Sequence, residues 1–311
     1  MDARGLHESH VVPTPSLDIA YEAAGPSDGP VVVLLHGFPY DVRCYDDVAS
    51  ILAQEGIRVV APYLRGFGPT RYRDPAVMRS GQQAALGQDL LDLLDALEVE
   101  RAVVGGFDWG GRAACIAAAA APERIAGLVT VGGYNIQNIA QSGEPAPPEV
   151  ESAAWYTHYF LTDRGRAGLE RYTDELCRLL WRQWSPTWTG CDTAFAATAP
   201  SLHNPDFVAT VIHSYRHRRA AAPGDPRYDN LEELLATSPA ITVPTVSLDA
   251  LADGLGPDDS RPDEPLFTGG FDRRDLPGIG HNPPQEDPAT FARAVLDVTA
   301  PGSPGGATFP A

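Results

Sequence analysis

A short glycine-flanked turn, Gly106-Phe107-Asp108-Trp109-Gly110, carries the residues of this chain that are best suited to covalent chemistry. It follows an apolar run at residues 102–104 and precedes a helix-like stretch at residues 112–121. A strand, a sharp turn and a helix in this order have the spacing of a nucleophile elbow. Glycine is favoured on both sides because the turn is tight and the strand and helix backbones pass close to it.

Asp108 stands at the central position, where this turn has Ser in esterases. A carboxylate there can attack the carbon of an epoxide or an alkyl halide, which leaves an ester on the protein. Asp is also a favoured helix N-cap, an interpretation that accounts for the Asp but not for its glycines or for the partners below. The pattern therefore predicts Asp108 as a nucleophile.

A second motif, His36-Gly37-Phe38-Pro39, directly follows the apolar run at residues 31–35. In an elbow-type site, a loop here supplies one N–H of the oxyanion hole, and the residue after the nucleophile supplies the other. The sequence thus predicts the backbone N–H groups of Phe38 and Trp109 for this role. Substrate contacts are predicted for His36, Phe38 and Trp109. Four residues also fit an ordinary strand-to-helix turn, so the prediction depends on the register with the elbow.

His281 lies on a glycine-flanked loop, residues 278–283, before the last expected helix. A histidine titrates near neutrality, so it can take a proton from water and return it. The chain has eight histidines. His281 is chosen because the order nucleophile, acid, base predicts a histidine near this position.

The acid of this set is expected after a strand that ends near Leu248. Asp253 is the preferred candidate, since the acid usually lies some residues beyond the strand, and it would orient His281. Asp249 is the rival, and Asp258 and Asp259 are weaker candidates. The alternative is that this acidic loop is merely solvated.

The composition limits the class of protein. The 311 residues suffice for one large domain or for a core with an inserted module, and a hydrophobic content of 43% permits a sizeable core. A net charge of −18 disfavours nucleic acids and anionic membranes as partners. The chain shows no signal-peptide core and no apolar span, so we expect a cytoplasmic protein. Its four scattered cysteines indicate buried thiols and no metal site.

Apolar runs alternate with helical patterns along most of the chain. Strands are expected at residues 31–35, 58–61, 101–104, 125–131, 241–246 and 271–276, and helices at 40–55, 82–97, 112–121 and 287–298. This alternation predicts a parallel sheet with helices on both faces.

The alternation stops after Tyr134 and resumes near residue 241. The intervening stretch is rich in aromatic residues and Pro and has helical character. We therefore expect a core at residues 1–135 and 239–300, a helical cap at 136–238 and a disordered tail at 301–311. Such an insertion would cover the carboxyl ends of the strands, where a lid over a pocket belongs.

Together these motifs resemble the epoxide hydrolase branch of the α/β-hydrolase superfamily, over about residues 17–298. Arg65-Gly66-Phe67-Gly68 belongs to the resemblance too. It implies an α/β-hydrolase fold: a mostly parallel eight-stranded sheet, helices on both faces and an inserted helical cap. It also implies two cap tyrosines that hold the epoxide oxygen, here Tyr156 and Tyr215. A phenol can donate to the oxygen as its negative charge develops.

The resemblance implies opening of an epoxide to a vicinal diol through an Asp108 ester, without a metal or organic cofactor. Trp155 is predicted to contact the substrate, whereas Trp181, Trp184 and Trp188 are expected in the core. An aromatic cap suits a bulky or polycyclic epoxide. Some similar proteins tailor aromatic polyketides in actinobacteria, which would place this chain in secondary metabolism.

Two alternatives remain. A haloalkane-type dehalogenase uses the same Asp, His and acid, and a non-catalytic ligand-binding member of the fold would not need them. Two candidate tyrosines favour the epoxide. A cap that closes over its substrate is compatible with a homodimer, although the sequence shows no interface.

Overall fold

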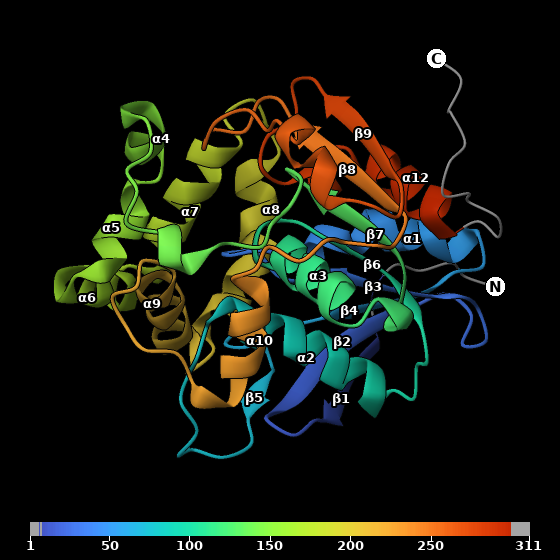
Figure 1. The fold of residues 1–311 in the computed structure, drawn as a ribbon, viewed down its shortest axis with the longest axis horizontal. Coiled ribbons are helices and arrows are strands. Elements are labelled where there is room, and N and C mark those ends of the chain that lie inside the picture. The colour runs from blue at the N-terminus through green and yellow to red at the C-terminus, as the bar shows by residue number, and fades with distance from the viewer. Residues whose placement is uncertain (1–5, 7, 300–311) are drawn as a thin grey trace.

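A nine-stranded sheet forms the centre of the protein (Figure 1). The structure is a computed structural model that describes Leu6 and residues 8–299. Eight strands follow the order β1-β2-β4-β3-β6-β7-β8-β9, and the two-residue β5 pairs with β2. β1 and β2 are antiparallel to their neighbours, and the other pairs along this path are parallel. The predicted α/β fold with a mostly parallel sheet is confirmed.

The strands in the middle of the sheet are continuous apolar runs because helices cover both of their faces. Every residue of β6 is buried, for example. The strand bounds are Glu8–Pro13 (β1), Leu17–Ala24 (β2), Val31–Leu35 (β3), Arg58–Pro62 (β4), Arg71–Tyr72 (β5), Ala102–Gly106 (β6), Ile125–Val131 (β7), Thr245–Ala250 (β8) and Phe271–Leu276 (β9).

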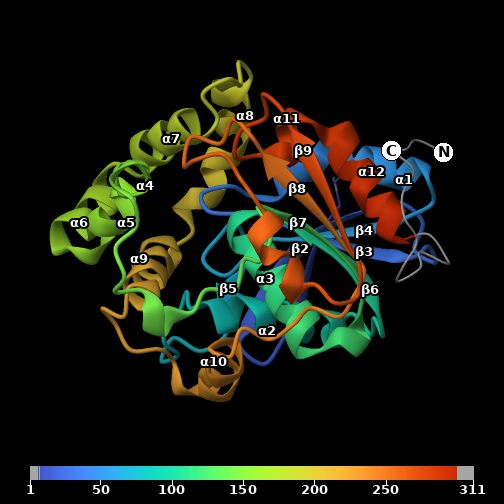
Figure 2. The same cartoon turned by 45° about the horizontal axis from the view of Figure 1, so that its top comes forward.

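Two layers of helices enclose the sheet. α1 (Asp46–Gln54) and α12 (Pro288–Thr299) pack together on one face, and α2 (Gln83–Ala96) packs against α3 (Asp108–Ala120) on the other. Figure 2 shows the two pairs on opposite sides of the strands. Because β3, β6, β7 and β8 are parallel, the carboxyl ends of β3, β6 and β8 lie at the same edge of the sheet.

A helical insertion between β7 and β8 stands beside the core (Figures 1 and 2). Its helices are α4 (Pro148–Ala153), α5 (Trp155–Leu161), α6 (Asp163–Arg171), α7 (Thr173–Trp184), α8 (Cys191–Thr198), α9 (Phe207–Arg218) and α10 (Asp229–Leu235). We call α4–α9 the cap. α10 also falls in the predicted cap range, but it packs against α2 and α3 of the core.

Two details of the sequence prediction were wrong. The strand expected at residues 241–246 is β8, which starts at Thr245 and runs to Ala250. Pro244 has no N–H to donate to a neighbouring strand, and Ile241 forms only an isolated bridge with Phe267. β1 and β2 were missed, although β2 has the alternating burial of a half-covered strand. The tail predicted at residues 301–311 lies outside the described residues.

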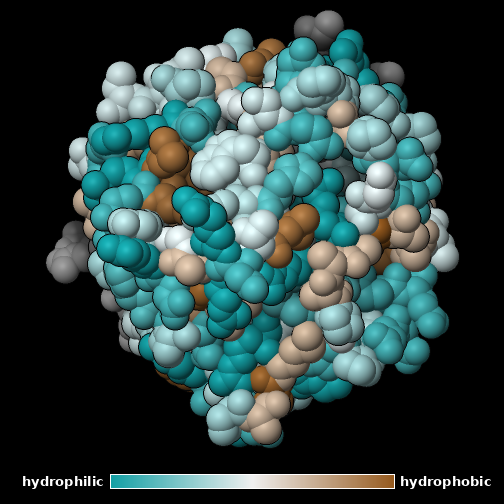
Figure 3. Space-filling model, turned by 90° about the vertical axis from the view of Figure 1, so that its left-hand side faces the viewer, coloured by the Kyte–Doolittle hydropathy of each residue, from teal (hydrophilic) through white to brown (hydrophobic). Residues whose placement is uncertain are grey.

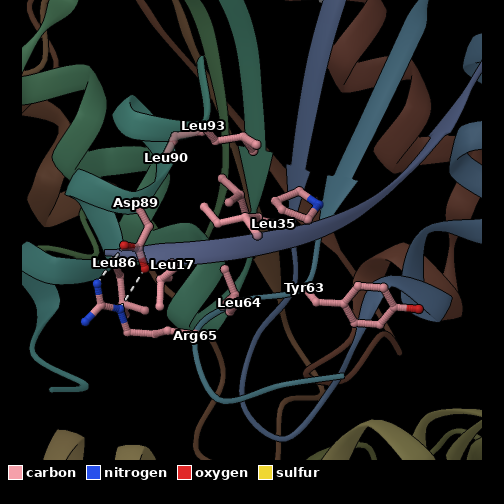
Figure 4. Close-up of a pocket in the computed structure, with 11 residues that line it drawn as sticks. Leu17, Leu35, Tyr63, Leu64, Arg65, Leu86, Asp89, Leu90 and Leu93 are labelled. Atoms are coloured by element: carbon pink, nitrogen blue, oxygen red, sulfur yellow. Dashed lines mark hydrogen bonds and ion pairs between the residues drawn. The ribbon is translucent and has the colours of Figure 1, made fainter. Parts of the chain in front are cut away.

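A small cavity of about 10 Å³ lies between the sheet and α2, lined mainly by leucines and by the buried ion pair of Arg65 and Asp89 (Figure 4). That space suits at most one water molecule. None of the residues predicted for the site lines it. The cap face in Figure 3 is mostly hydrophilic, with hydrophobic residues in small separate groups. Within residues 8–299, no helix combines the length and the apolar character that crossing a bilayer requires.

Candidate active site

The turn between β6 and α3 holds Asp108 in a strained conformation. Its φ is +50°, which is uncommon for a residue with a side chain. The backbones are so close that a Cβ at position 110 would come within 1.8 Å of the Leu35 carbonyl oxygen, and one at position 37 within 2.6 Å of the Asp108 Cβ. Both positions therefore require glycine. This geometry presents the carboxylate at the end of β6, with 13% of the side chain exposed.

Two backbone N–H groups stabilise the charge of the Asp108 carboxylate. The Phe38 N–H donates to Oδ1 over 2.7 Å, and the Trp109 N–H lies close enough to favour the ionised form. Burial would raise the pKa of Asp108, but the His281 imidazole and these two donors outweigh burial and hold it below its usual range. Asp108 is therefore ionised at neutral pH, as a carboxylate nucleophile must be.

His281 lies between two carboxylates. Its Nδ1 is 2.6 Å from Asp253 Oδ2, and its Nε2 is 3.8 Å from Asp108 Oδ2. Asp253 is itself held, because its Oδ1 accepts the Leu255 N–H over 2.8 Å. Burial lowers the pKa of His281, but the charges of Asp253 and Asp108 together raise it well above the ordinary value.

The other candidate acids face elsewhere. Asp249 lies within β8 and accepts from Arg273 Nε (2.7 Å) and from the Ser260 N–H (2.9 Å). Asp258 accepts the Ala250 N–H, and Asp259 pairs with the exposed Arg261. Asp253 is thus the candidate that the structure brings to His281.

The two predicted tyrosines meet above the elbow, one from α5 and one from α9. The rings of Tyr156 and Tyr215 are 5.4 Å apart and nearly perpendicular, and both are buried. Phe38 lies beneath them, with its ring 5.5 Å from Tyr215 and 5.6 Å from Trp109. Burial raises the pKa of both tyrosines, and the negative charge of Asp108 raises it further. Their hydroxyls are therefore protonated at neutral pH and able to donate.

Two predicted substrate contacts have polar partners within the protein. The His36 ring accepts the Leu64 N–H at Nε2 and donates from Nδ1 to the Gly37 carbonyl, and burial lowers its pKa to about 4. Its neutral ring thus holds the loop that carries Phe38. Trp155 is partly buried beside Tyr156 and donates to Gln183.

Trp184, expected only in the core, lies at the site. Its ring is 4.9 Å from the His281 ring, and its carbonyl accepts the N–H groups of both Gly254 and His281. Trp181 and Trp188 do pack away from the base: Trp181 stacks on Tyr40 and Trp188 stacks on Trp181. No local sequence pattern distinguishes the tryptophan that contacts His281 from the tryptophans that pack in the interior of the cap.

Glu286 is a second residue at the site that the sequence did not predict. Its carboxylate accepts the N–H groups of Gly280 (2.8 Å) and Asn282 (3.1 Å), which flank His281, and the Ser185 hydroxyl (2.7 Å). Glu286 ends the short helix α11 (Pro283–Glu286), where no local pattern distinguishes it, so only the fold shows that it holds the histidine loop.

Several buried polar atoms near the elbow have no hydrogen-bond partner among the described residues, including the donors Trp109 Nε1, Trp184 Nε1 and the Tyr215 hydroxyl. Buried polar groups normally are paired, so such atoms next to a nucleophile indicate where an electron-rich atom of a ligand would lie. The site thus joins a carboxylate nucleophile, an oriented base and donors on the cap side.

Comparison with known proteins places this arrangement in a family. Residues 30–263 match the alpha/beta hydrolase fold family. The chain belongs to the α/β hydrolase fold family. Its relatives include proteins named for epoxide and haloalkane chemistry.

A crystal structure of a "putative epoxide hydrolase" from Klebsiella pneumoniae is 43% identical, with a TM-score of 0.94 over 96% of this chain and 99% of that one. Epoxide hydrolase B of Mycobacterium tuberculosis is 34% identical over 44% of this chain and 41% of its own length. A haloalkane dehalogenase of Mycobacterium marinum is 35% identical over 39% of this chain and 40% of its own. The chain spans about half the length, or less, of the first curated relatives it matches.

Proposed function

We propose that this protein is an epoxide hydrolase in which Asp108 forms a hydroxyalkyl ester with its substrate. The observation that carries the proposal is that the Asp108 carboxylate lies 3.8 Å from His281, while Tyr215, packed on Tyr156, contacts the rings of Phe38 and Trp109 beside it. The names of its relatives support it.

In the first step, an Asp108 oxygen attacks an epoxide carbon from the side opposite the ring oxygen, and the C–O bond breaks. Tyr156 and Tyr215 donate to the departing oxygen, and one of them supplies its proton. Because both hydroxyls carry their protons at neutral pH, they are in the state that this step needs.

Formation of the ester removes the negative charge of Asp108, one of the two charges that raise the pKa of His281, and so favours the neutral imidazole. In the second step, neutral His281 takes a proton from water, and this water attacks the carbonyl carbon of the ester. Asp253 stabilises the resulting imidazolium through its 2.6 Å contact with Nδ1. The N–H groups of Phe38, which bonds the Asp108 carboxylate, and of Trp109 would then hold the oxyanion. When the intermediate collapses, the imidazolium returns its proton to the leaving oxygen and the diol is released. The carboxyl proton of Asp108 then replaces the one that the tyrosine gave up, which restores both groups.

A single turnover in heavy-oxygen water tests the ester. The new hydroxyl of the first diol should come from Asp108 and carry no label, and later turnovers should incorporate it. Immediate label in the first product would mean that water opens the ring directly, which would sink the proposal. Asp108→Asn should abolish turnover, provided that slow deamidation back to Asp is excluded.

One observation favours a second candidate, a haloalkane-type dehalogenase. The unpaired indole N–H groups of Trp109 and Trp184 could bind a halide as it leaves. Assays for diol and for released halide on matched substrates separate the two activities.

The aromatic residues around Phe38 support a substrate with aromatic bulk, which agrees with a place in secondary metabolism. A cytoplasmic location and a homodimer stay predictions.

A further inference from the structure

A cavity of about 180 Å³ adjoins Tyr215 on the cap side, away from His281. It is lined by Gln137, Thr157, Tyr215, Arg218 and Arg219. These residues come from the loop after β7, from α5 and from the end of α9. Two lining residues are cationic and none is acidic, although the chain as a whole has a net charge of −18.

The arginines of this cavity bond only to neutral groups. Arg218 Nε donates to the Gln137 side-chain oxygen over 2.9 Å, and Arg219 donates to the Thr157 hydroxyl over 3.3 Å. Among the described residues, no carboxylate oxygen lies within ion-pair distance of either guanidinium, although the charge of Arg219 acts on Glu151, whose carboxylate bonds His158. Arg216 on the same helix, in contrast, pairs with Asp163.

A third cation, Arg112, is connected to the cavity through Gln83 and the lining residue Gln137. Arg112 is 91% buried, and its only hydrogen bond among the described residues goes to Gln83, whose side chain also bonds the backbone of Gln137. Its Nε has no partner, and burial, then the charge of Arg218, lower its pKa to about 9. The negative charge of Asp108 offsets burial only in part. A buried cation with incomplete compensation is costly, so a bound anion nearby would reduce that cost.

The cations also lie close to the reacting groups. The Arg218 guanidinium is 5.5 Å from the centre of the Tyr215 ring, and its charge influences both Tyr156 and Tyr215. The C-terminal dipole of α9 favours some positive charge here, but it does not require a cavity between two guanidinium groups. A planar guanidinium binds a carboxylate through two parallel hydrogen bonds.

We propose that this cavity is an anion subsite, in which Arg218 and Arg219 bind a carboxylate carried by the substrate while its epoxide lies between Asp108 and the two tyrosines. The inference rests on the proposed epoxide hydrolase activity and narrows its substrates to epoxides that bear an acid group. Arg218 and Arg219 are then specificity residues and take no part in bond breaking.

The test compares aryl epoxides that carry a meta or para carboxylate with their carboxamide analogues, which match in size but have no charge. In the wild type, kcat/KM should be at least about tenfold higher for the better carboxylate than for its amide. Arg218→Gln should remove this preference, mainly by raising KM for the carboxylate, whereas kcat/KM for the amide should fall less because the amide forms no ion pair. Arg218→Lys should keep part of it. Arg216→Gln is the matched control on the same helix and should change neither rate.

Binding of benzoate, measured by calorimetry, separates the two proposals because it needs no turnover. Saturable benzoate binding to the wild type that weakens in Arg218→Gln and Arg219→Gln supports the anion subsite. If this binding is seen but no epoxide reacts, the proposed epoxide hydrolase activity is rejected and the subsite is not. The anion subsite would be overturned if the protein hydrolysed the carboxylate and amide epoxides at equal rates. It would also be overturned if benzoate bound with the same affinity to the wild type and to both variants.

Discussion

Trp184 contacts the loops of His281 and Asp253 through its backbone as well as its ring. Its carbonyl oxygen accepts the His281 N–H over 3.2 Å, and the two rings lie 4.9 Å apart. The same carbonyl accepts the N–H of Gly254, next to Asp253. The end of α7 in the cap therefore helps to place both the base and the acid.

Two substitutions of Trp184 should separate the role of its indole N–H from the packing of its side chain. Trp184→Phe keeps the carbonyl and most of the packing, so the protein should stay folded while any role of the indole N–H is lost. If the indole binds a leaving halide, dehalogenation should fall by at least about tenfold. Hydrolysis of epoxides should change less. Trp184→Ala should lower the free energy of unfolding by about 3–5 kcal/mol, measured by urea denaturation.

His281→Gln should trap the ester. The first step requires Asp108 and the tyrosines but no base, so the variant should react once and stop. Intact-mass spectrometry should show a mass increase equal to one epoxide. The double variant Asp108→Asn/His281→Gln should show none, and an adduct there would place the nucleophile elsewhere.

Asp253→Asn should mainly impair catalysis, whereas Asp249→Asn should mainly lower the stability of the fold. Asn at position 253 removes the charge that orients His281, so ester hydrolysis should slow by about 10³-fold or more in single-turnover assays, with a smaller effect on ester formation. Asn at position 249 weakens the contact with Arg273, and the main effect should be a loss of stability of about 3 kcal/mol. A larger catalytic defect at 249 than at 253 would contradict the assignment.

Tyr156→Phe and Tyr215→Phe should each slow ester formation by about 10- to 100-fold, because two donors share the developing charge on oxygen. The double variant should lose most activity toward epoxides. Rapid-quench measurement of the first turnover checks this step directly. Unchanged rates in both single variants would show that these hydroxyls do not hold the oxygen.

The stability of the protein should depend on the protonation of His281. Its pKa in the folded state is raised above the ordinary value of about 6.5 by Asp253 and Asp108, after the opposing effect of burial. Proton binding therefore stabilises the folded state fully below about pH 6.5, and this contribution disappears as the pH rises through the folded-state pKa.

Denaturation of the wild type and of His281→Gln at a series of pH values from about 6 upward measures this contribution. The difference in unfolding free energy should shrink as the pH rises. In Asp108→Asn, NMR should show a lower His281 pKa, because one of the two negative charges is gone. An unchanged pKa there would mean that Asp108 does not influence the imidazole.

Local patterns sufficed for the parallel strands and for the elbow, because each is encoded by a few neighbouring residues. The boundaries were less certain where a proline intervened, as at Pro244, since strand pairing depends on a partner distant in the sequence. The position of α10 against α2 and α3 depends likewise on contacts that no local pattern encodes.

By itself, the sequence determined the chemical types at the site: a glycine-flanked Asp108, the loop of Phe38, and His281 before the last helix. Only the tertiary structure decided that Asp253 rather than Asp249 faces His281, that Trp184 and Glu286 hold the base, and that Arg218 and Arg219 border a cavity beside Tyr215. The physical reason is that motif residues act through short-range backbone geometry. Carboxylate, indole and guanidinium side chains acquire their roles from partners that only folding brings near.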